Sequence, residues 1–240
     1  MDEQLELEFG PMPEWSKSLA VFDLETTGLD LREARIVTAC AVRIDDAGEV
    51  VGLNKEWLAN PGIEIPAAAS NVHGITTQIA AEKGADPSQV IKEILDTLRF
   101  FLEEGIPVVA YNAPYDFTIL HHEALRYGLE PIADPKPIID PLVLDKFVDT
   151  YRKGKRTLSV AASIYGVSLE DAHNATADAI AAGRVAQSIA RRHADKLSMN
   201  AYDLHEAQII WSAQQDESYE KFRRASIPDF SVQRGWPVKL

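Results

Sequence analysis

The stretch LAVFDLETTGLD, residues 19–30, joins a short apolar segment to a Thr-Thr-Gly turn. An apolar, β-branched run of this length predicts a buried strand that ends at the turn. Residues two apart on a strand point to the same side, so Asp23 and Glu25 project together while Phe22 and Leu24 face the opposite layer. Adjacent carboxylates repel, and their natural counter-charge near a core is a divalent cation with oxygen ligands, Mg²⁺ or Mn²⁺. The alternative is a pair of solvated acids at a strand end.

The composition is that of a globular protein with a large negative charge. The chain has 240 residues, a formal net charge of −13 and 46% hydrophobic residues. This length suits a single domain with a full core. The negative charge argues against a broad duplex-DNA binder, which should be basic, but it allows an enzyme that holds a few nucleotides through metal ions.

Three features bear on where the protein works. No apolar run is long enough to span a bilayer, and no secretory signal is visible at the N-terminus. The single cysteine, Cys40, lies among apolar residues and cannot form an internal disulfide, which fits a reducing compartment. We therefore expect a cytoplasmic protein that does not enter a membrane.

The order of strands and helices predicts an α/β fold. Two strands joined by the turn-forming residues 45–49 follow the first one and complete an antiparallel meander. Beyond residue 87 strands and helices alternate, which implies parallel pairing with helices packed on the sheet. We expect strands at 34–44, 50–58, 108–111 and 137–140 and helices at 87–104, at 114–127, from Pro141 and from Asn174.

We divide the chain into three parts. Residues 1–16 are acidic and carry two prolines, which predicts a flexible leader, and residues 17–196 form the main domain. Residues 197–240 form a C-terminal helical extension and tail. Its helix is expected to be amphipathic, with a stripe made of Leu204, Ile210, Trp211 and Phe222.

Three further residues are candidates for the same site. Asp116 falls in the first turn of the helix that begins near Pro114, where its simplest role is to complement the helix dipole. Asp178 lies early in the helix capped by Asn174, on the face turned toward the sheet, where a carboxylate needs a partner. His173 precedes that helix and can lean over the site, although a lone histidine is more often a surface or core residue.

Four segments together resemble the motifs of one enzyme family. FDLETTG, NPGIEIPAAASNVHGIT, YNAPYDFTIL and HNATADA are similar, in this order, to the motifs of the DnaQ-like DEDD 3′→5′ exonucleases. The histidine in the last motif marks the DEDDh branch, which includes the proofreading epsilon subunit of bacterial replicase, ribonuclease T and oligoribonuclease. The resemblance runs from about Leu19 to about Ala194.

The resemblance implies a fold, a reaction and a set of site residues. The implied fold is the ribonuclease H-like α/β fold, a mixed five-stranded sheet flanked by helices. The implied reaction is hydrolysis from the 3′ end of single-stranded DNA, which releases nucleoside 5′-monophosphates. His173 is the implied general base, and two Mg²⁺ or Mn²⁺ ions would be bound by Asp23, Glu25, Asp116 and Asp178. An RNA-trimming exoribonuclease and a replisome-associated binding module remain alternatives.

Other residues are expected to contact the substrate. The turn made of Thr26, Thr27 and Gly28 would approach the terminal sugar, and His73 and Asn112 are candidates for contacts to the terminal nucleotide. Some family members carry a glutamate five residues before the His73 position, where this chain has Ala68, so the fit of the substrate can differ. The basic residues 152–156 either follow the phosphates of a single strand or serve as a solvated loop.

One short peptide suggests a partner. Residues Gln4–Phe9, QLELEF, resemble the peptide by which bacterial replication proteins dock onto the sliding clamp. Such a peptide would lie extended and place alternate apolar side chains in pockets. An alternating segment could equally add a strand to its own sheet. The oligomeric state stays open.

Overall fold

The computed structural model describes residues 11–169 and 174–240. Five strands form one sheet in the order β3-β2-β1-β4-β5. β1 pairs with β2 and β2 with β3 in antiparallel fashion, whereas β1–β4 and β4–β5 are parallel. The predicted mixed sheet of five strands is therefore confirmed. Its strands are β1 (Leu19–Thr26), β2 (Ile36–Ile44), β3 (Val50–Leu58), β4 (Val108–Val109) and β5 (Ile138–Ile139).

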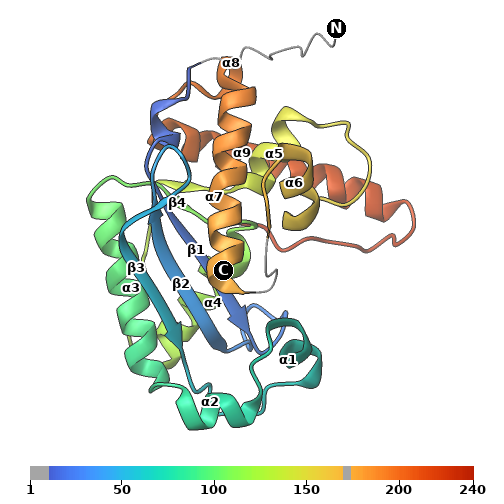
Figure 1. The fold of residues 1–240 in the computed structure, drawn as a ribbon. Coiled ribbons are helices and arrows are strands. Elements are labelled where there is room, and N and C mark those ends of the chain that lie inside the picture. Colours follow the sequence, from blue (N-terminus) through green and yellow to red (C-terminus); the bar gives the residue numbers. More distant parts are fainter. Residues whose placement is uncertain (1–10, 170–173) are drawn as a thin grey trace, which may run out of the picture.

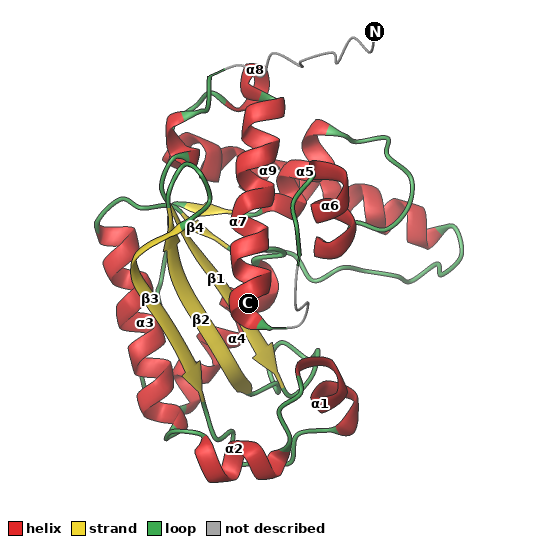
Figure 2. Ribbon diagram, viewed as in Figure 1, coloured by secondary structure: helices red, strands yellow, loops and turns green. Residues whose placement is uncertain are grey.

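Helices cover both faces of this sheet, as Figures 1 and 2 show. α3 and α4 pack on one face and α7 on the other. No helix in the described ranges is both long enough and apolar enough to cross a membrane. The helices are α1 (Ala67–His73), α2 (Thr77–Lys83), α3 (Pro87–Glu103), α4 (Pro114–Arg126), α5 (Pro141–Val148), α6 (Leu158–Tyr165), α7 (Ala175–Arg192), α8 (Ala194–Leu197) and α9 (Ala201–Arg224), with a short 3₁₀ helix at Glu14–Ser16.

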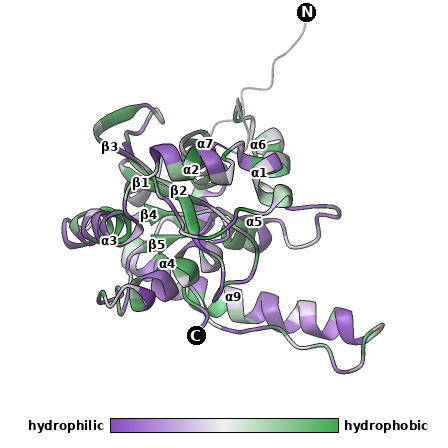
Figure 3. Ribbon diagram, turned by 90° about the horizontal axis from the view of Figure 1, so that it is seen from below, coloured by the Kyte–Doolittle hydropathy of each residue, from purple (hydrophilic) through white to green (hydrophobic). Residues whose placement is uncertain are grey.

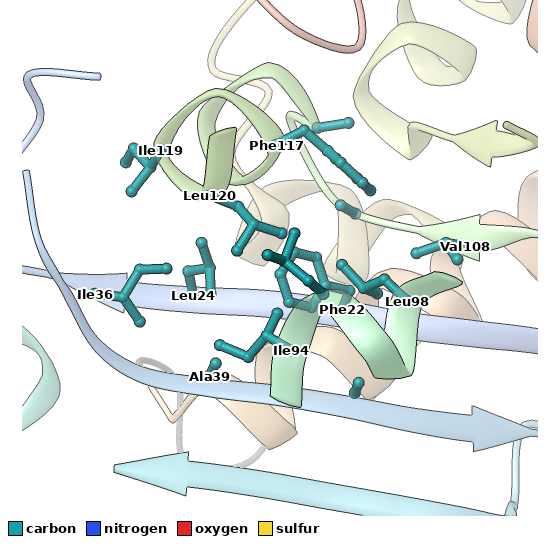
Figure 4. Packing of buried hydrophobic residues seen from close by; sticks show 14 of the residues in the cluster. Phe22, Leu24, Ile36, Ala39, Ile94, Leu98, Val108, Phe117, Ile119 and Leu120 are labelled. Atoms are coloured by element: carbon teal, nitrogen blue, oxygen red, sulfur yellow. The ribbon is translucent and has the colours of Figure 1, made fainter. Parts of the chain in front are cut away.

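β1 separates the core into two layers by simple alternation. Phe22 and Leu24 are buried in the cluster between the sheet, α3 and α4, which Figure 4 shows from close by. Val21 belongs to the cluster on the α7 side. Because side chains alternate along a strand, Asp23 and Glu25 continue the α7 side of β1, as the sequence predicted. β1 is the middle strand of the sheet. Burial of each of its large apolar side chains stabilises this arrangement by about 1.5–3 kcal/mol.

α7 lies unusually close to the sheet at one glycine. A Cβ atom on Gly183 would come within 2.4 Å of Cγ1 of Val21 and 2.6 Å of Cδ1 of Ile44. Side chains on real residues do not approach so closely, so only glycine permits this contact. Gly183 therefore sets how near α7, with Asp178 in its first turn, comes to β1.

α9 closes the free edge of β5 with side chains. His205 Nδ1 accepts a hydrogen bond from Ile138 N–H at 3.0 Å, and Gln208 Oε1 accepts one from Asp140 N–H at 2.7 Å. Gln208 Nε2 also donates to the Ile138 carbonyl at 3.0 Å. These side chains stand where a further strand would otherwise pair.

The apolar stripe predicted for α9 is wrong at two of its four positions. Leu204 is buried and Trp211 is partly buried, but Ile210 is 58% exposed and Phe222 is 73% exposed. The far half of α9 extends beyond the body and is mostly hydrophilic (Figure 3), and the C-terminal tail contacts it at Tyr219 and Glu220 without burying Phe222. The buried face is partly polar because it bonds to β5.

Segments near both ends of the described chain pack on the main domain. Trp15 is buried and its Nε1 donates to the Leu197 carbonyl at 2.8 Å. Trp236 is buried in the cluster beneath α4, and Lys239 N–H donates to Thr118 Oγ1 at 2.9 Å. The boundaries at 16 and 196 remain predictions, but the extension shares its core with the sheet.

Candidate active site

Three carboxylates meet where β1 passes the first turn of α7. One oxygen each from Asp23, Glu25 and Asp178 lies within 4.8 Å of the other two. Asp23 and Glu25 come from the α7 side of β1, and Asp178 comes from α7 itself. The two-residue spacing on the strand predicted that Asp23 and Glu25 share one side, and the place of Asp178 on the sheet-facing side of its helix predicted that it approaches them.

The start of α7 is fixed from two sides. Asn174 Oδ1 accepts hydrogen bonds from the N–H groups of Thr176 and Ala177 at 3.0 and 3.2 Å, which confirms the predicted N-cap. The Cys40 thiol is buried in β2 and donates to the Ala175 carbonyl at 3.1 Å. Cys40 lies opposite Asp23 on the neighbouring strand. The contact between Cys40 and Ala175 therefore holds α7 close to the strand that carries the acids.

Asp116 reaches the same place from the opposite layer. α4 begins with Pro114 in its first turn, as predicted, and Asp116 follows in that turn at 1% exposure. Its Oδ1 accepts a hydrogen bond from Leu24 N–H at 3.1 Å, between the two acids of β1. This leaves its second oxygen for another partner.

The carboxylates of this site repel one another, and burial adds to the cost of their charges. Burial, followed by the charge of Asp116, raises the pKa of Asp23 well above its usual range. Burial also raises the pKa of Asp116, and burial with the charge of Asp178 raises the pKa of Glu25 to about 7. In the described part of the chain, no lysine or arginine forms an ion pair with Asp23, Glu25 or Asp116.

Such a donor set suits a hard divalent cation. Carboxylate oxygens are the ligands that Mg²⁺ and Mn²⁺ prefer, and a bound cation would remove the repulsion that raises these pKa values. Asp23, Glu25 and Asp178 are close enough to share one ion, and the Asp116 charge acts directly on Asp23.

A second buried acid, Asp140, holds the turn that leads into α4. Its two oxygens accept hydrogen bonds from the N–H groups of Asn112 at 2.9 Å and Ala113 at 3.0 Å. Asn112 has a left-handed φ of 64°, which is uncommon for a residue with a side chain. Trp236 Nε1 also donates to Asp140, at 3.3 Å. No local sequence signal marks Asp140, because these partners are far apart in the chain.

The hydroxyl groups of the Thr-Thr-Gly turn bond to the protein. Thr26 Oγ1 lies 2.5 Å from the Tyr115 hydroxyl and 2.8 Å from the Gly28 carbonyl, to which the Tyr115 hydroxyl also donates at 2.9 Å. Thr27 Oγ1 accepts from Arg35 N–H at 3.0 Å. Burial raises the pKa of Tyr115 to about 12, so its hydroxyl stays protonated. These bonds lock the turn, and Tyr115 is a residue that the sequence analysis missed.

His73 lines a cleft of about 320 Å³ next to the acids. The cleft lies between β2, β3 and the start of α7, and Thr38, Glu56 and Asn174 also line it. His73 Nδ1 accepts from Ile75 N–H at 3.2 Å, so the proton of the neutral ring resides on Nε2. This atom is buried and has no hydrogen-bond partner within the described residues. Burial lowers the pKa of His73, which keeps the ring neutral.

The arginines of the basic loop are held within the protein. Asp145, which is fully buried, forms ion pairs with Arg152 and with Arg156, the latter at 2.8 Å. Arg152 also pairs with Asp149 at 3.0 Å. Lys153 and Lys155 are the remaining cations of the loop and are exposed. Two further predicted features, His173 and the peptide Gln4–Phe9, lie outside the described residues.

Comparison with known proteins gives the family. A family model described as Exonuclease (RNase T) matches residues 20–186. The chain is 34% identical over 167 residues to a DNA polymerase III subunit epsilon-like protein of Rhodobacter capsulatus, covering 68% of this chain and 22% of that protein. It is 31% identical over 165 residues to a PolC-type DNA polymerase III of Pediococcus pentosaceus, covering 69% of this chain and 11% of that one. The chain thus spans about a tenth to a fifth of the length of these curated relatives.

Solved structures agree on the fold. A structure of exonuclease I superposes with a TM-score of 0.64 at 20% identity, over 78% of this chain and 43% of that one. The Escherichia coli exonuclease I in complex with a dA16 oligonucleotide gives a TM-score of 0.64 at 19% identity, over 78% and 42%. This likeness confirms the ribonuclease H-like fold that the resemblance implied. With the family model spanning β1 to α7, the chain belongs to the exonuclease family.

Proposed function

We propose that this protein is a metal-dependent 3′→5′ exonuclease that acts on single-stranded DNA. The observation that carries the proposal is the meeting of Asp23, Glu25 and Asp178 within 4.8 Å, with the buried Asp116 beside them and raised pKa values at Asp23, Glu25 and Asp116. Single-stranded DNA is favoured because the relatives are named as DNA polymerases or epsilon-like proteins and one structural neighbour is a complex with an oligodeoxynucleotide.

The roles of the residues follow from their positions. Asp23, Glu25, Asp116 and Asp178 would hold two Mg²⁺ or Mn²⁺ ions at the scissile phosphate. When bound, such a pair polarises the attacking water and stabilises charge on the leaving 3′ oxygen. His173 is assigned as the general base because it directly precedes Asn174, the N-cap of the helix that carries Asp178. A neutral histidine there would take the proton of the water, and a nucleoside 5′-monophosphate would leave.

The terminal nucleotide is assigned to the cleft beside His73. The buried Nε2–H of His73 lies near the Thr26 backbone and offers a donor to a sugar or base. Asn112 lies at the strained turn before α4, where its side chain would contact the same nucleotide. Since both threonine hydroxyls hold the turn, the contact of residues 26–28 to the terminal sugar would come from their backbone.

The test is a nuclease assay with a matched variant. Wild-type protein should shorten a 5′-labelled single strand stepwise from its 3′ end in Mg²⁺ or Mn²⁺, and EDTA should stop the reaction. Asp23→Asn should abolish cleavage. Asp96→Asn, which changes an exposed acid on α3, should not affect it. Cleavage by Asp23→Asn at the wild-type rate would refute the site, and faster cleavage of an RNA strand would favour the RNA-trimming alternative.

The sliding clamp remains the proposed partner of Gln4–Phe9, in keeping with an editing role beside a replicative polymerase. The relatives named as DNA polymerase III support such a role. Deletion of residues 1–10 should abolish co-purification with the clamp and leave hydrolysis unchanged. Clamp binding that survives the deletion would contradict this assignment.

A further inference from the structure

A large groove lies between α5, the basic loop and α9. We call it the α5–α9 groove, and its volume is about 730 Å³, more than twice the 320 Å³ of the cleft beside the acids. The lining combines aromatic and cationic side chains and, within the described chain, includes no aspartate or glutamate. This is unusual in a protein whose net charge is −13. The residues that matter here are Lys146, Phe147, Lys153, Trp211, Tyr219 and Phe222.

Contacts within the protein fix two walls of this groove, α5 against α9 and the basic loop against Asp145. Phe147 of α5 and Trp211 of α9 stack with ring centroids 3.7 Å apart and planes 10° apart, which joins the two helices. Buried Asp145 holds the basic loop through Arg152 and Arg156 and accepts from the Tyr165 hydroxyl at 2.8 Å. Because these side chains are already held in place, the protein loses less conformational entropy when a ligand binds in the groove.

The cations that remain for a ligand are lysines. Arg152 and Arg156 are neutralised by Asp145 and Asp149, so Lys146 and Lys153 carry the positive charge that faces the groove. Burial lowers the pKa of Lys146, and the charges of Asp140 and Asp216 act in the opposite direction, whereas Lys153 is exposed. The groove is thus a local positive spot on an acidic molecule, which attracts anions to this place and repels them elsewhere.

Two of the aromatic side chains that line the groove are exposed. Phe222 is 73% exposed and Tyr219 is 46% exposed. Exposed aromatic rings beside lysines are the recurring platform for single-stranded nucleic acid, because every base has a flat face that stacks on a ring while the lysines contact phosphates. A purely electrostatic ligand would have no use for these rings.

α5 and the basic loop connect the groove to the segment that leads into α4 and Asp116. α5 begins at Asp140, which binds the turn before α4, and its eight residues extend about 12 Å toward the groove. The Tyr111 hydroxyl donates to the Arg156 carbonyl at 2.8 Å, so the basic loop is tied to the end of β4 next to Asn112. A strand whose 3′ end is at the acids would reach the groove a few nucleotides upstream.

We propose that the α5–α9 groove binds the single strand on the 5′ side of the scissile phosphate. The proposal rests on the proposed function and adds to it that the preferred substrate is a strand several nucleotides long. The terminal nucleotide is held beside His73, and upstream bases stack on Tyr219 and Phe222 while Lys146 and Lys153 contact the backbone.

The experiment compares a substrate that can reach the groove with one that cannot. An oligothymidylate of about 12 nucleotides can span both places, whereas the p-nitrophenyl ester of thymidine 5′-monophosphate occupies only the acid site. Phe222→Ala should lower kcat/KM on the oligonucleotide about 5- to 100-fold, and Lys153→Glu about 3- to 10-fold with a weaker dependence on salt. Both variants should hydrolyse the ester at the wild-type rate.

Two controls match these variants. Phe100→Ala removes an exposed phenylalanine from α3, and Lys92→Glu makes the same charge reversal on that helix. Both controls should behave as wild type on the two substrates. Equal losses on the ester would reveal a structural role, and normal cleavage of the oligonucleotide by both groove variants would assign the groove to another partner; either result overturns the inference. If the wild type hydrolyses neither substrate with Mg²⁺, the proposed function itself fails.

Discussion

Two sets of buried acids in this protein are treated in opposite ways. Glu123 is fully buried, and its oxygens accept from Arg35 Nε at 2.9 Å and from Ile36 N–H at 3.1 Å. Asp145 is likewise buried between two arginines. The charged groups that act on Asp23 and Asp116 are other carboxylates, which raise the pKa values of both residues.

The difference separates acids that stabilise the fold from acids that await a ligand. A buried charge with its own cation is already satisfied, and removing it leaves the cation unpaired. A buried charge beside like charges must take up a proton or a metal ion. The same residue type therefore has opposite effects on stability in the two places.

The largest effect is expected at the acid site. Asp116→Asn keeps an oxygen to accept from Leu24 N–H but removes a charge, so activity should fall about 1,000-fold or more. The melting temperature in EDTA should stay the same or rise, because a repelled charge has been removed. Nuclease kinetics and thermal denaturation of the same sample measure both quantities. A loss of stability that parallels the loss of activity would place Asp116 in the structural set.

The opposite outcome is expected for Asp145→Asn. This variant leaves two arginines without their shared partner and should lower the free energy of unfolding by about 3 kcal/mol. Urea denaturation measures the change. Asp149→Asn removes an acid that is 43% exposed from the same loop, and it should cost about 1 kcal/mol or less. Similar midpoints for the two variants would argue against the distinction.

The pH dependence of the metal-free protein should reveal the unsatisfied set. Burial raises the pKa values of Asp23, Asp116 and Glu25 in the folded state, the last to about 7. Between about pH 4 and about pH 7 the folded protein therefore binds more protons than the unfolded chain, and the free energy of unfolding falls as the pH rises.

Added Mg²⁺ replaces those protons, so its stabilising effect should be larger at about pH 8 than at about pH 5, by a few °C in melting temperature. Thermal denaturation with EDTA or Mg²⁺ at each pH measures this. A magnesium shift that is the same at both pH values would show that the acids do not hold the ion.

The smallest effect is expected at Trp236. Trp236→Phe keeps a ring against His205 but removes the 3.3 Å hydrogen bond to Asp140, which should cost about 1 kcal/mol. Because Asp140 keeps its bonds to Asn112 and Ala113, kcat should fall less than about threefold. Urea denaturation and single-strand kinetics give the two values. An activity loss beyond tenfold would mean that the tail positions α4 more strictly than its single bond suggests.

The sequence could predict what depends on neighbours in the chain. Alternation along β1 placed Asp23 and Glu25 on one side, Pro114 marked the start of α4, and Asn174 marked that of α7. These signals are local, so they are legible without the fold.

What the sequence could not predict depends on distant partners. The bonds of Asp140 to Asn112 and Trp236 span 28 and 96 residues. The basic loop resembled a surface for phosphates, but Asp145 holds its arginines. Helical spacing alone predicted burial for Phe222, which is 73% exposed because the far half of α9 extends beyond the body.

The absence of a side chain at Gly183 suggests a route to a conditional allele. Gly183→Ala would place a methyl group 2.4 Å from Val21, so α7 would have to lift away from the strand that carries half of the acids. Such a protein could keep its sheet and lose the alignment of its carboxylates as the temperature rises. A geneticist would then have a single base change that switches the enzyme off without removing it from the cell.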